Sequence, residues 1–343
     1  MLVADIDLRV LRANAVAVKK AVQTDLCAVV KADAYGHGAV RVAHALSGVA
    51  DEFAVATYDE AHELVKAGIN EPINVLECVD CDFFDKKAQQ TAFMSGIVPT
   101  ICGFDEIDCL VGKTKRVNVK LNTGMNRLGI SADKLDLLIA RIKDGGIAVH
   151  SIFSHLYNAS DEGQAETQYR IFEAATKKYA PQIRRHLCAS SAPELDPKYR
   201  FDMIRSGIAL YGYSALTKPA MSVHTSILQI TNVKQGEHIS YGDYIAPRDM
   251  KVAAIRVGYA DGYRRINGKE RYVSINGVRC PVVGQVCMDI TLVDVSTAVL
   301  HGRDRVYLLG GGISGEELAC SCDTIVYEIL TSFKGRIKRN YVG

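Results

Sequence analysis

The chain lacks the long apolar run and the excess of one charge that mark several classes of protein. No apolar stretch in its 343 residues approaches the roughly 20 residues that span a bilayer. The formal net charge is only +2, so nothing indicates a nucleic acid or an anionic membrane as partner. The first residues contain neither a basic nor a long apolar region, so we expect no secretory signal and a cytoplasmic protein.

Cysteine is not scarce, but its ten copies lack the spacing of a small disulfide scaffold. In a chain of this length, that scatter predicts free thiols and a reducing compartment. Cys78 and Cys81 form a CxxC sequence, which is compatible with half of a zinc site, a redox pair, or ordinary small residues near a strand end. Cys320 and Cys322 leave the same choices. The other half of a metal site is missing, so we assign no metal.

Low-complexity tracts and sequence repeats are also absent, apart from an alternation of apolar and amphipathic stretches in the first two-thirds of the chain. The apolar runs are short and rich in Val, Ile and Leu, as is typical of strands buried on both faces. They lie at 26–30, 53–56, 73–76, 97–101, 117–121, 147–153, 186–189 and 204–210. Thr57 followed by Glu60 predicts the capped start of one intervening helix, which Gly68 ends. Eight runs with helices between them predict an α/β fold, a (β/α)8 barrel of the TIM type.

The pattern changes after about residue 213. The runs become short and β-branched, with Gly or Asn between them, at 223–231, 251–257, 272–275, 280–283, 290–293 and 306–309. Asn276 and Gly277 indicate a hairpin, and residues 314–330 are expected to be helical. We therefore predict a barrel domain over 1–215, followed by a mainly β domain over 216–343.

Lys31 is the most informative single residue. It is expected at the C-terminal end of the first buried strand, which is the active-site face of such a barrel. Partial burial there favours the neutral amine, and hence nucleophilic or Schiff-base chemistry. Taken alone, a lysine paired with an acid at a strand end is an equally good interpretation. Tyr35, Gly36 and Gly38 follow on a loop where the backbone can approach a ligand closely.

Residues 29–38, VVKADAYGHG, resemble the cofactor-binding motif of the alanine racemase family and depart from it only at Asp33, where the family has asparagine. The resemblance continues over essentially the whole chain. It implies pyridoxal 5'-phosphate as cofactor, carried by Lys31 with Tyr35 beside it. It also implies an isomerase that interconverts L- and D-alanine and supplies D-alanine for peptidoglycan.

Further barrel motifs resemble the family's cofactor and substrate sites. Arg127 matches the arginine that contacts the cofactor's phenolic oxygen near the substrate carboxylate. Lys120 matches a lysine that is often carbamylated and then helps orient that arginine, although Asn122 replaces the commoner aspartate. His155 matches the histidine that stacks on the pyridine ring.

The phosphate and the ring nitrogen of the cofactor have matches as well. Ser191 matches a serine that binds the phosphate, with Ser190 in place of an asparagine, and Gly207 and Ile208 match backbone donors to the same group. Arg205 matches the arginine at the pyridine nitrogen. Because arginine keeps its proton, that nitrogen stays unprotonated and the cofactor is a weaker electron sink. This favours return of the proton to the substrate over side reactions.

Racemisation removes a proton from one face of the α-carbon and delivers one to the other, so two bases are the simplest solution. The lysine serves one face. Tyr241 matches the second base, which the partner subunit supplies in this family, so the resemblance implies a homodimer. Tyr259 and Arg265 match residues at the substrate entrance. Met288 and Asp289 match a segment in which the methionine N–H meets the substrate carboxylate.

Three alternatives remain at this point. Gly335 stands where many relatives have a tyrosine that limits the pocket, which keeps open a racemase of serine or of broader specificity. A non-catalytic pyridoxal-phosphate-binding protein of this fold generally lacks the β domain that contains Tyr241. A barrel-type decarboxylase places an acidic residue at the pyridine nitrogen, where this chain has Arg205.

Overall fold

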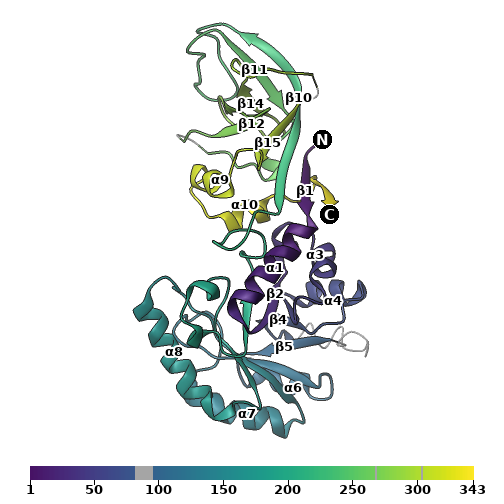
Figure 1. Ribbon diagram of the computed structural model, residues 1–343, viewed down its shortest axis with the longest axis vertical. Coiled ribbons are helices and arrows are strands. Elements are labelled where there is room, and N and C mark those ends of the chain that lie inside the picture. The colour runs from purple at the N-terminus through teal and green to yellow at the C-terminus, as the bar shows by residue number, and fades with distance from the viewer. Residues whose placement is uncertain (82–95, 267–268, 303) are drawn as a thin grey trace. The chain divides into compact units, whose positions relative to one another are not determined.

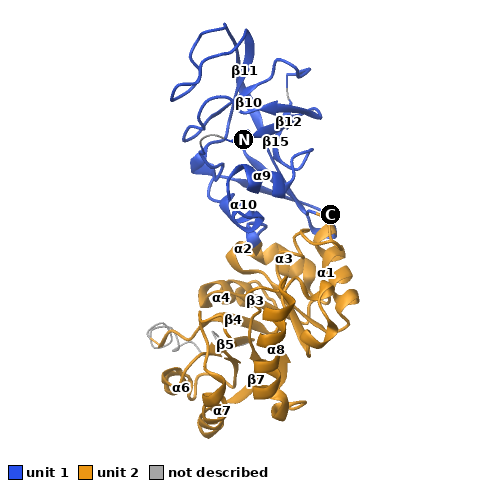
Figure 2. Cartoon of the chain, turned by 90° about the vertical axis from the view of Figure 1, so that its left-hand side faces the viewer, with its two compact units in different colours: residues 1–9, 35–38, 219–343 blue, residues 10–34, 39–218 orange. Residues whose placement is uncertain are grey.

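Two compact units make up the chain in the computed structural model (Figure 2). The structure describes residues 1–81, 96–266, 269–302 and 304–343. Unit 1 contains Met1–Arg9, Tyr35–Gly38 and Pro219–Gly343, and unit 2 contains Val10–Ala34 and Ala39–Lys218. The chain passes from unit 2 to unit 1 between Lys218 and Pro219, close to the boundary expected near residue 215. The first nine residues nevertheless belong with the C-terminal part of the chain.

Unit 2 is built on a sheet of eight parallel strands in the order β8-β7-β6-β5-β4-β3-β2-β9. Figure 1 labels β2, β4 and β5 of this sheet. The strands are β2 (Asp25–Val29), β3 (Glu52–Val55), β4 (Ile73–Cys78), β5 (Ile97–Ile101), β6 (Arg116–Lys120), β7 (Ala148–Phe153), β8 (Arg184–His186) and β9 (Met203–Ser206). The Arg205 N–H donates to the Cys188 carbonyl at 3.1 Å, which joins β9 to the chain leaving β8 and brings the two ends of the sheet together. The predicted TIM-type barrel is confirmed.

The helices of unit 2 alternate with its strands along the chain. They are α1 (Leu8–Val22), which starts in unit 1, α3 (Ala39–Leu46), α4 (Tyr58–Lys66), α6 (Asp105–Leu110), α7 (Leu135–Asp144) and α8 (Glu162–Thr176), with short 3-10 turns η2 (Ala132–Lys134), η3 (Lys177–Tyr179), η4 (Ala192–Glu194) and η5 (Pro197–Tyr199). The buried residues of α7 recur at helical spacing, at Leu135, Leu138, Ile139 and Ile142. At the start of α4, the Thr57 hydroxyl accepts the Glu60 N–H and the Glu60 carboxylate accepts the Thr57 N–H. The predicted capping box is confirmed.

A left-handed turn follows Lys31 directly, in the short element α2 (Lys31–Tyr35). The φ angles of residues 32–35 lie between 52° and 54°, a region that costs an L-residue roughly 1–2 kcal/mol. The sequence predicted only a loop here. Four such residues in a row persist only where the surroundings over-determine the backbone, which is common at functional sites.

Two carboxylates hold this turn in place. The Ala32 N–H donates to Oε1 of Glu60 at 2.7 Å. Oδ1 of Asp33 accepts the Ala39 N–H at 2.8 Å, where α3 begins. An asparagine oxygen would accept the same bond, so the departure of Asp33 from the family motif preserves this contact.

Unit 1 is mainly β. One path through its sheet runs β13-β12-β15-β10-β1-β16, and β11 pairs with both β10 and β14. The strands are β1 (Val3–Asp7), β10 (Met221–Val233), β11 (Met250–Ile255), β12 (Tyr272–Ile275), β13 (Val278–Pro281), β14 (Thr291–Asp294), β15 (Arg305–Leu309) and β16 (Lys338–Val342). Asn276 and Gly277, with φ of 51° and 81°, turn β12 into β13 as the predicted hairpin. The mainly β C-terminal part is confirmed.

The segment expected to be helical over 314–330 is helical for the most part, but it is divided into two elements. Two helices occupy this region, α9 (Gly315–Ser321) and α10 (Val326–Ser332), and a 3-10 turn, η6 (Tyr259–Asp261), precedes them in unit 1. Asp323 adopts a left-handed φ of 52°, a conformation in which a helix commonly ends. Within the residues that the structure describes, no helix has the length and apolar character required to cross a membrane.

Candidate active site

A cluster of basic side chains surrounds His155 in unit 2. Lys31 follows β2, Lys120 ends β6, Arg205 lies on β9, and Arg127 lies in the loop after β6. Burial first, and then the charges of these four side chains, lower the pKa of His155 to about 3. All four must lie near the imidazole to act on it in this way. The structure therefore brings together five residues that the sequence predicted for one site.

The Lys31 amine is half-buried in this cluster. Burial and the charge of Arg127 lower its pKa, against the opposing charges of Glu60 and Glu77. A larger share of the amine is therefore neutral near pH 7 than in a solvated lysine. A neutral amine at a strand end suits covalent attachment of an aldehyde.

Lys120 is buried, with 7% of its surface exposed. Burial and the charges of Arg127, Arg205 and Lys31 lower its pKa to about 8. Its Nζ lies 5.4 Å from the centre of the Phe153 ring, and no carboxylate forms an ion pair with it among the described residues. A buried lysine amine among other positive charges is stable in its neutral form, or as a derivative that has a negative charge.

Arg205 is 4% exposed, and the barrel engages both of its terminal nitrogens. Nη1 donates to Nδ1 of His186 at 2.7 Å, and Nη2 donates to Nδ1 of His155 at 3.2 Å and to backbone carbonyls. The Nε–H group has no hydrogen-bond partner among the described residues. The guanidinium therefore retains one donor for an acceptor that approaches from the site, as a pyridine nitrogen would.

The loop after β9 offers further donors to an anion. The backbone N–H of Ile208 has no hydrogen-bond partner within the described part of the chain, although the residue is only 7% exposed. The Ser191 hydroxyl makes no capping bond to η4. The Gly207 N–H is engaged, because it donates to Oγ of Ser190 at 2.8 Å. Of the expected phosphate donors, Ile208 and Ser191 are thus open, and Gly207 supports the loop instead.

Tyr241, Met288 and Tyr259 are exposed on unit 1, by 64%, 53% and 41%. They belong to neighbouring segments, since the Tyr259 N–H donates to the Cys287 carbonyl at 3.1 Å and Oγ of Ser240 lies 3.5 Å from Sγ of Cys287. The Met288 N–H has no partner among the described residues. A tyrosine, a methionine and a free backbone donor are therefore presented together on the surface of this unit.

Supporting polar contacts hold these exposed segments. Nε of Arg265 donates to Oε1 of Gln285 at 2.6 Å, and Asp289 pairs with Arg336 at 2.8 Å. The backbone approaches so closely beside Tyr259 that a Cβ on Gly258 would lie 2.1 Å from the Met288 carbonyl oxygen. Only glycine fits there.

Two further residues of the sequence analysis lie in unit 1. The Tyr35 ring is buried, and its centre lies 5.9 Å from that of the Tyr327 ring; burial raises the pKa of its phenol. Gly335 has a φ of 71°, and a Cβ placed on it would meet nothing within 4 Å. The space that a tyrosine would fill at this position is open.

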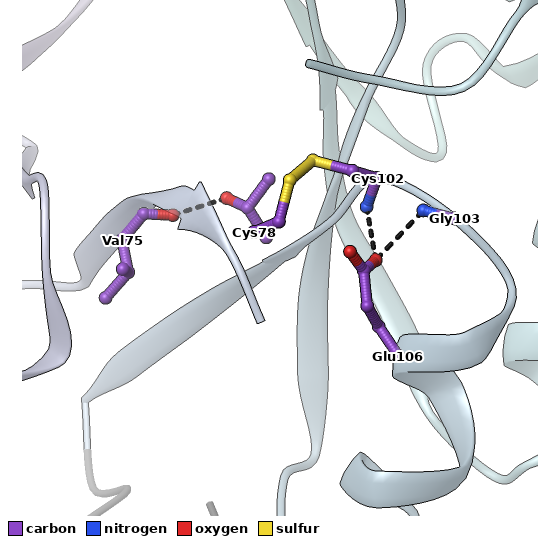
Figure 3. The surroundings of a disulfide bond; sticks show 6 residues. Val75, Cys78, Cys102, Gly103 and Glu106 are labelled. Carbon is purple, nitrogen blue, oxygen red and sulfur yellow. Dashed lines mark hydrogen bonds between the residues drawn. A yellow bond between two sulfur atoms is a disulfide. The ribbon is translucent and has the colours of Figure 1, made fainter. Parts of the chain in front are cut away.

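The expectation that all the cysteines are free thiols is wrong. Cys78, at the end of β4, forms a disulfide with Cys102, which follows β5 (Figure 3). The two residues meet because β4 and β5 are parallel neighbours that end at the same edge of the sheet. Cys78 is therefore not a redox partner of Cys81, whose Sγ lies 2.6 Å from Sγ of Cys109.

A metal site does not follow from these cysteines. The one group of three potential metal ligands among the described residues combines Cys78, Cys102 and Glu106. Both sulfurs are used in the disulfide, and the Glu106 carboxylate accepts the backbone N–H groups of Cys102 and Gly103 at 2.6 and 2.9 Å (Figure 3). The Glu106 carboxylate therefore serves the backbone N–H groups just before α6, and the two cysteines serve the disulfide.

Two residues of the site were missed from the sequence. His186 holds Arg205 through Nδ1, and the Ser190 hydroxyl holds Gly207. No signal in the sequence identified His186, since it lies in an apolar run that predicted only a strand. Ser190 was noted as a departure from a motif, but its role depends on the fold of the loop after β9.

Comparison with known proteins gives matches over almost the whole chain. Residues 6–215 match the family model described as "Alanine racemase, N-terminal domain", and residues 220–341 match "Alanine racemase, C-terminal domain". The alanine racemase of Mycobacterium tuberculosis (strain ATCC 25618 / H37Rv) is 36% identical over 348 residues, which cover 92% of this chain and 89% of that protein.

Solved structures that resemble this chain are alanine racemases as well. The biosynthetic alanine racemase from Pseudomonas aeruginosa is 32% identical, with a TM-score of 0.88, and the match covers 100% of this chain and 99% of that one. The alanine racemase from Bartonella henselae with covalently bound pyridoxal phosphate is 30% identical, with a TM-score of 0.88 and 99% of both chains covered.

Proposed function

The chain belongs to the alanine racemase family, and on that premise we propose that it interconverts L- and D-alanine with pyridoxal 5'-phosphate bound at Lys31. The observation that carries the proposal is the half-buried Lys31 amine, with a lowered pKa, inside a cluster of cations. Such a cluster suits a cofactor that has a phosphate and a phenolate, and a substrate that has a carboxylate. In the cell, the product would supply D-alanine for peptidoglycan.

The residues present fit this cofactor. The partnerless Nε–H of Arg205 suits the pyridine nitrogen, and the Ile208 N–H and the Ser191 hydroxyl suit the phosphate, with Gly207 supporting their loop. Tyr35 stays a cofactor-binding residue by resemblance. His155 would lie against the ring. Once bound, the cofactor supplies an electron sink that acidifies the Cα–H bond of the amino acid. Arg205 would keep that sink weak, because it would donate a hydrogen bond to the ring nitrogen without giving up its proton.

The chain's own residues would bind the substrate and move the proton. Arg127 and the Met288 N–H would orient the substrate carboxylate, with Tyr259, Arg265 and Asp289 shaping the access to it. Lys31 would take or give the proton at one face of Cα, and Tyr241 would do so at the other. A phenol of ordinary pKa is a poor base at neutral pH, and the Nε2–H of the neutral His155 imidazole would donate a hydrogen bond that stabilises its phenolate form. The Lys120 amine would add CO2 as a carbamate, which places an anion beside Arg127.

We further propose that the active enzyme is a homodimer in which Tyr241 completes the partner's site. Its 64% exposure in the single chain supports this, since a catalytic phenol needs a less solvated setting. In this dimer, residues 1–215 would bind the cofactor and residues 216–343 would contribute to the partner's site. A cytoplasmic location remains a prediction.

The test follows L-alanine and L-serine separately by chiral chromatography, with purified protein and added pyridoxal phosphate. We expect fast racemisation of alanine and a loss of roughly 10³-fold or more in Lys31→Ala. The exposed Lys20→Ala is the matched control and should retain the activity. Bound cofactor without turnover of either amino acid would instead indicate a non-catalytic binding protein.

Serine is a second candidate substrate, and the open space at Gly335 favours it. A relaxed pocket should discriminate against serine by less than about 10⁴-fold in kcat/KM. Gly335→Tyr should then lower the rate on serine more than the rate on alanine. A discrimination above that limit in the unchanged chain would exclude serine as a second substrate.

A further inference from the structure

A file of hydrogen-bonded polar side chains runs through the interior of the barrel in unit 2. It starts at Arg205, whose Nη1 lies 2.7 Å from Nδ1 of His186. Nε2 of His186 lies 2.8 Å from Oγ of Ser151. The barrel interior is therefore not wholly apolar beneath the candidate site.

The file continues to the opposite end of the barrel. Oγ of Ser151 donates to Oδ1 of Asn118 at 2.7 Å, and Nδ2 of Asn118 donates to Oδ1 of Asn74 at 2.8 Å. Nδ2 of Asn74 then donates to Oε2 of Glu52 at 2.7 Å. None of these residues is more than 4% exposed. Glu52 is the first residue of β3, whereas Lys31 lies beyond the C-terminal end of β2.

Elementary hydrogen-bond chemistry gives this file a single direction. A guanidinium can only donate, so Nδ1 of His186 must accept and Nε2 must carry the ring proton. Burial and the charge of Arg205 lower the pKa of His186 well below its usual value, so the ring has only that one proton. Ser151 consequently accepts from His186 and donates onward, and a carboxylate, which can only accept, ends the file. Every donor points from Arg205 toward Glu52.

Contacts outside this file stabilise the ionised form of the Glu52 carboxyl group. Its Oε1 accepts from Nε2 of His150 at 2.9 Å and pairs with Nη1 of Arg184, which also pairs with Asp25. Burial acts to raise the pKa of Glu52, but the bonds from His150 and Asn74 and the charge of Arg184 lower it further, to below its usual value. Four neutral side chains thus connect the Glu52 carboxylate to the Arg205 guanidinium, and the two charged groups do not contact each other directly.

We propose that Glu52 is a positioning residue for the site: its negative charge, acting through Asn74, Asn118, Ser151 and His186, orients the Arg205 guanidinium toward the ring nitrogen of the cofactor. This rests on the proposed function. Hydrogen bonds in series polarise one another, so the charge at the far end strengthens the Arg205–His186 bond and holds the guanidinium in one plane. Groups that orient a ligand from behind in this way typically change activity by about 10- to 100-fold when they are altered.

The test is a double-mutant cycle in the full-length enzyme with its cofactor. Glu52→Gln removes the charge but keeps an oxygen for Asn74 to donate to, and Ser151→Ala breaks the file in its middle. We expect Glu52→Gln to lower kcat for alanine about 10-fold, with little change in KM and a shift in the visible absorbance of the bound cofactor. In the Ser151→Ala background, the same change should have almost no further effect. Asp25→Asn, which alters the other carboxylate paired with Arg184, should leave kcat and the absorbance unchanged.

Additive losses in the cycle, or an equal effect of Asp25→Asn, would overturn the proposal and leave Glu52 with a purely structural role. A second measurement does not depend on turnover or on folding of a variant. Nitrogen NMR of the unchanged chain without cofactor should show His186 neutral, with its proton on Nε2. The opposite tautomer, or a protonated ring, would overturn the proposed direction of the file. If this tautomer is found but alanine is not racemised, the proposed function fails while the file stands.

Discussion

Nη2 of Arg205 donates to Nδ1 of His155 at 3.2 Å. Since a guanidinium cannot accept, the His155 ring must carry its one proton on Nε2. The same guanidinium donates to Nδ1 of His186, so one cation sets the tautomer of two buried histidines. Both imidazoles remain neutral, and the Nε–H of Arg205 remains available to a ligand.

The neutral His155 ring predicts how stability depends on pH. Its pKa is about 3 in the folded chain, against an ordinary value of 6.5. Below pH 6.5 the unfolded chain binds a proton that the folded chain does not bind until about pH 3, so the free energy of unfolding falls as the pH drops through this window. His155→Gln should make that fall shallower, as measured by urea unfolding of the cofactor-free chain between pH 6.5 and pH 4. The exposed His301→Gln serves as the control, and equal slopes in all three chains would contradict the prediction.

Lys120 predicts a dependence of the same sign at high pH. Its pKa is about 8 in the folded chain, against 10.5 ordinarily, so between these values the unfolded chain holds the extra proton and the free energy of unfolding rises with pH. Lys120→Met should abolish this rise. It should also stabilise the cofactor-free chain at pH 7 by about 1–3 kcal/mol, because a buried like charge is removed. Urea unfolding in CO2-free buffer measures both effects, and a destabilised Lys120→Met would show that the charge is compensated.

The disulfide predicts a stability that depends on redox conditions. Cys78 and Cys102 close a loop with a sequence separation of 24, and a loop of this size is worth about 3 kcal/mol. Cys102→Ser should lower the free energy of unfolding by about that amount without reductant, and the difference should vanish when both chains are reduced. Cys188→Ser, at a buried free thiol, controls for the loss of a sulfur atom. Eight titratable thiols in the denatured, unreduced chain would agree with one disulfide, and ten would exclude it.

The sequence predicted the strands of unit 2 well because their apolar runs are short, regular and separated by amphipathic stretches. It could not predict the polar file, since Asn74, Asn118 and Ser151 lie within runs that are mostly apolar. Whether a polar residue in a strand meets a partner depends on the register and curvature of the sheet, which periodicity does not give. The same reason explains why Cys78 and Cys102 were not paired.

Other differences between the structure and the sequence-based prediction come from contacts between distant parts of the chain. The N-terminal strand β1 pairs with β10 and β16, which are more than 200 residues away, so its place in unit 1 leaves no local signal. The left-handed turn after Lys31 is built from residues that do not favour that conformation. Glu60, which lies in another helix, stabilises it. The candidate site residues themselves were predicted from motifs, and the structure brings those of the barrel together.

Mixing two inactive variants tests the central claim most directly. Lys31→Ala retains Tyr241, and Tyr241→Phe retains Lys31, so only a mixed dimer would contain one site with both bases. We predict that each variant alone leaves L-alanine nearly unracemised, by chiral chromatography with pyridoxal phosphate present, and that exchange of subunits between the two restores racemisation. Activity of either variant close to that of the unchanged chain would contradict the two-base account. A mixture that exchanges subunits but remains inactive would contradict a site shared between two copies.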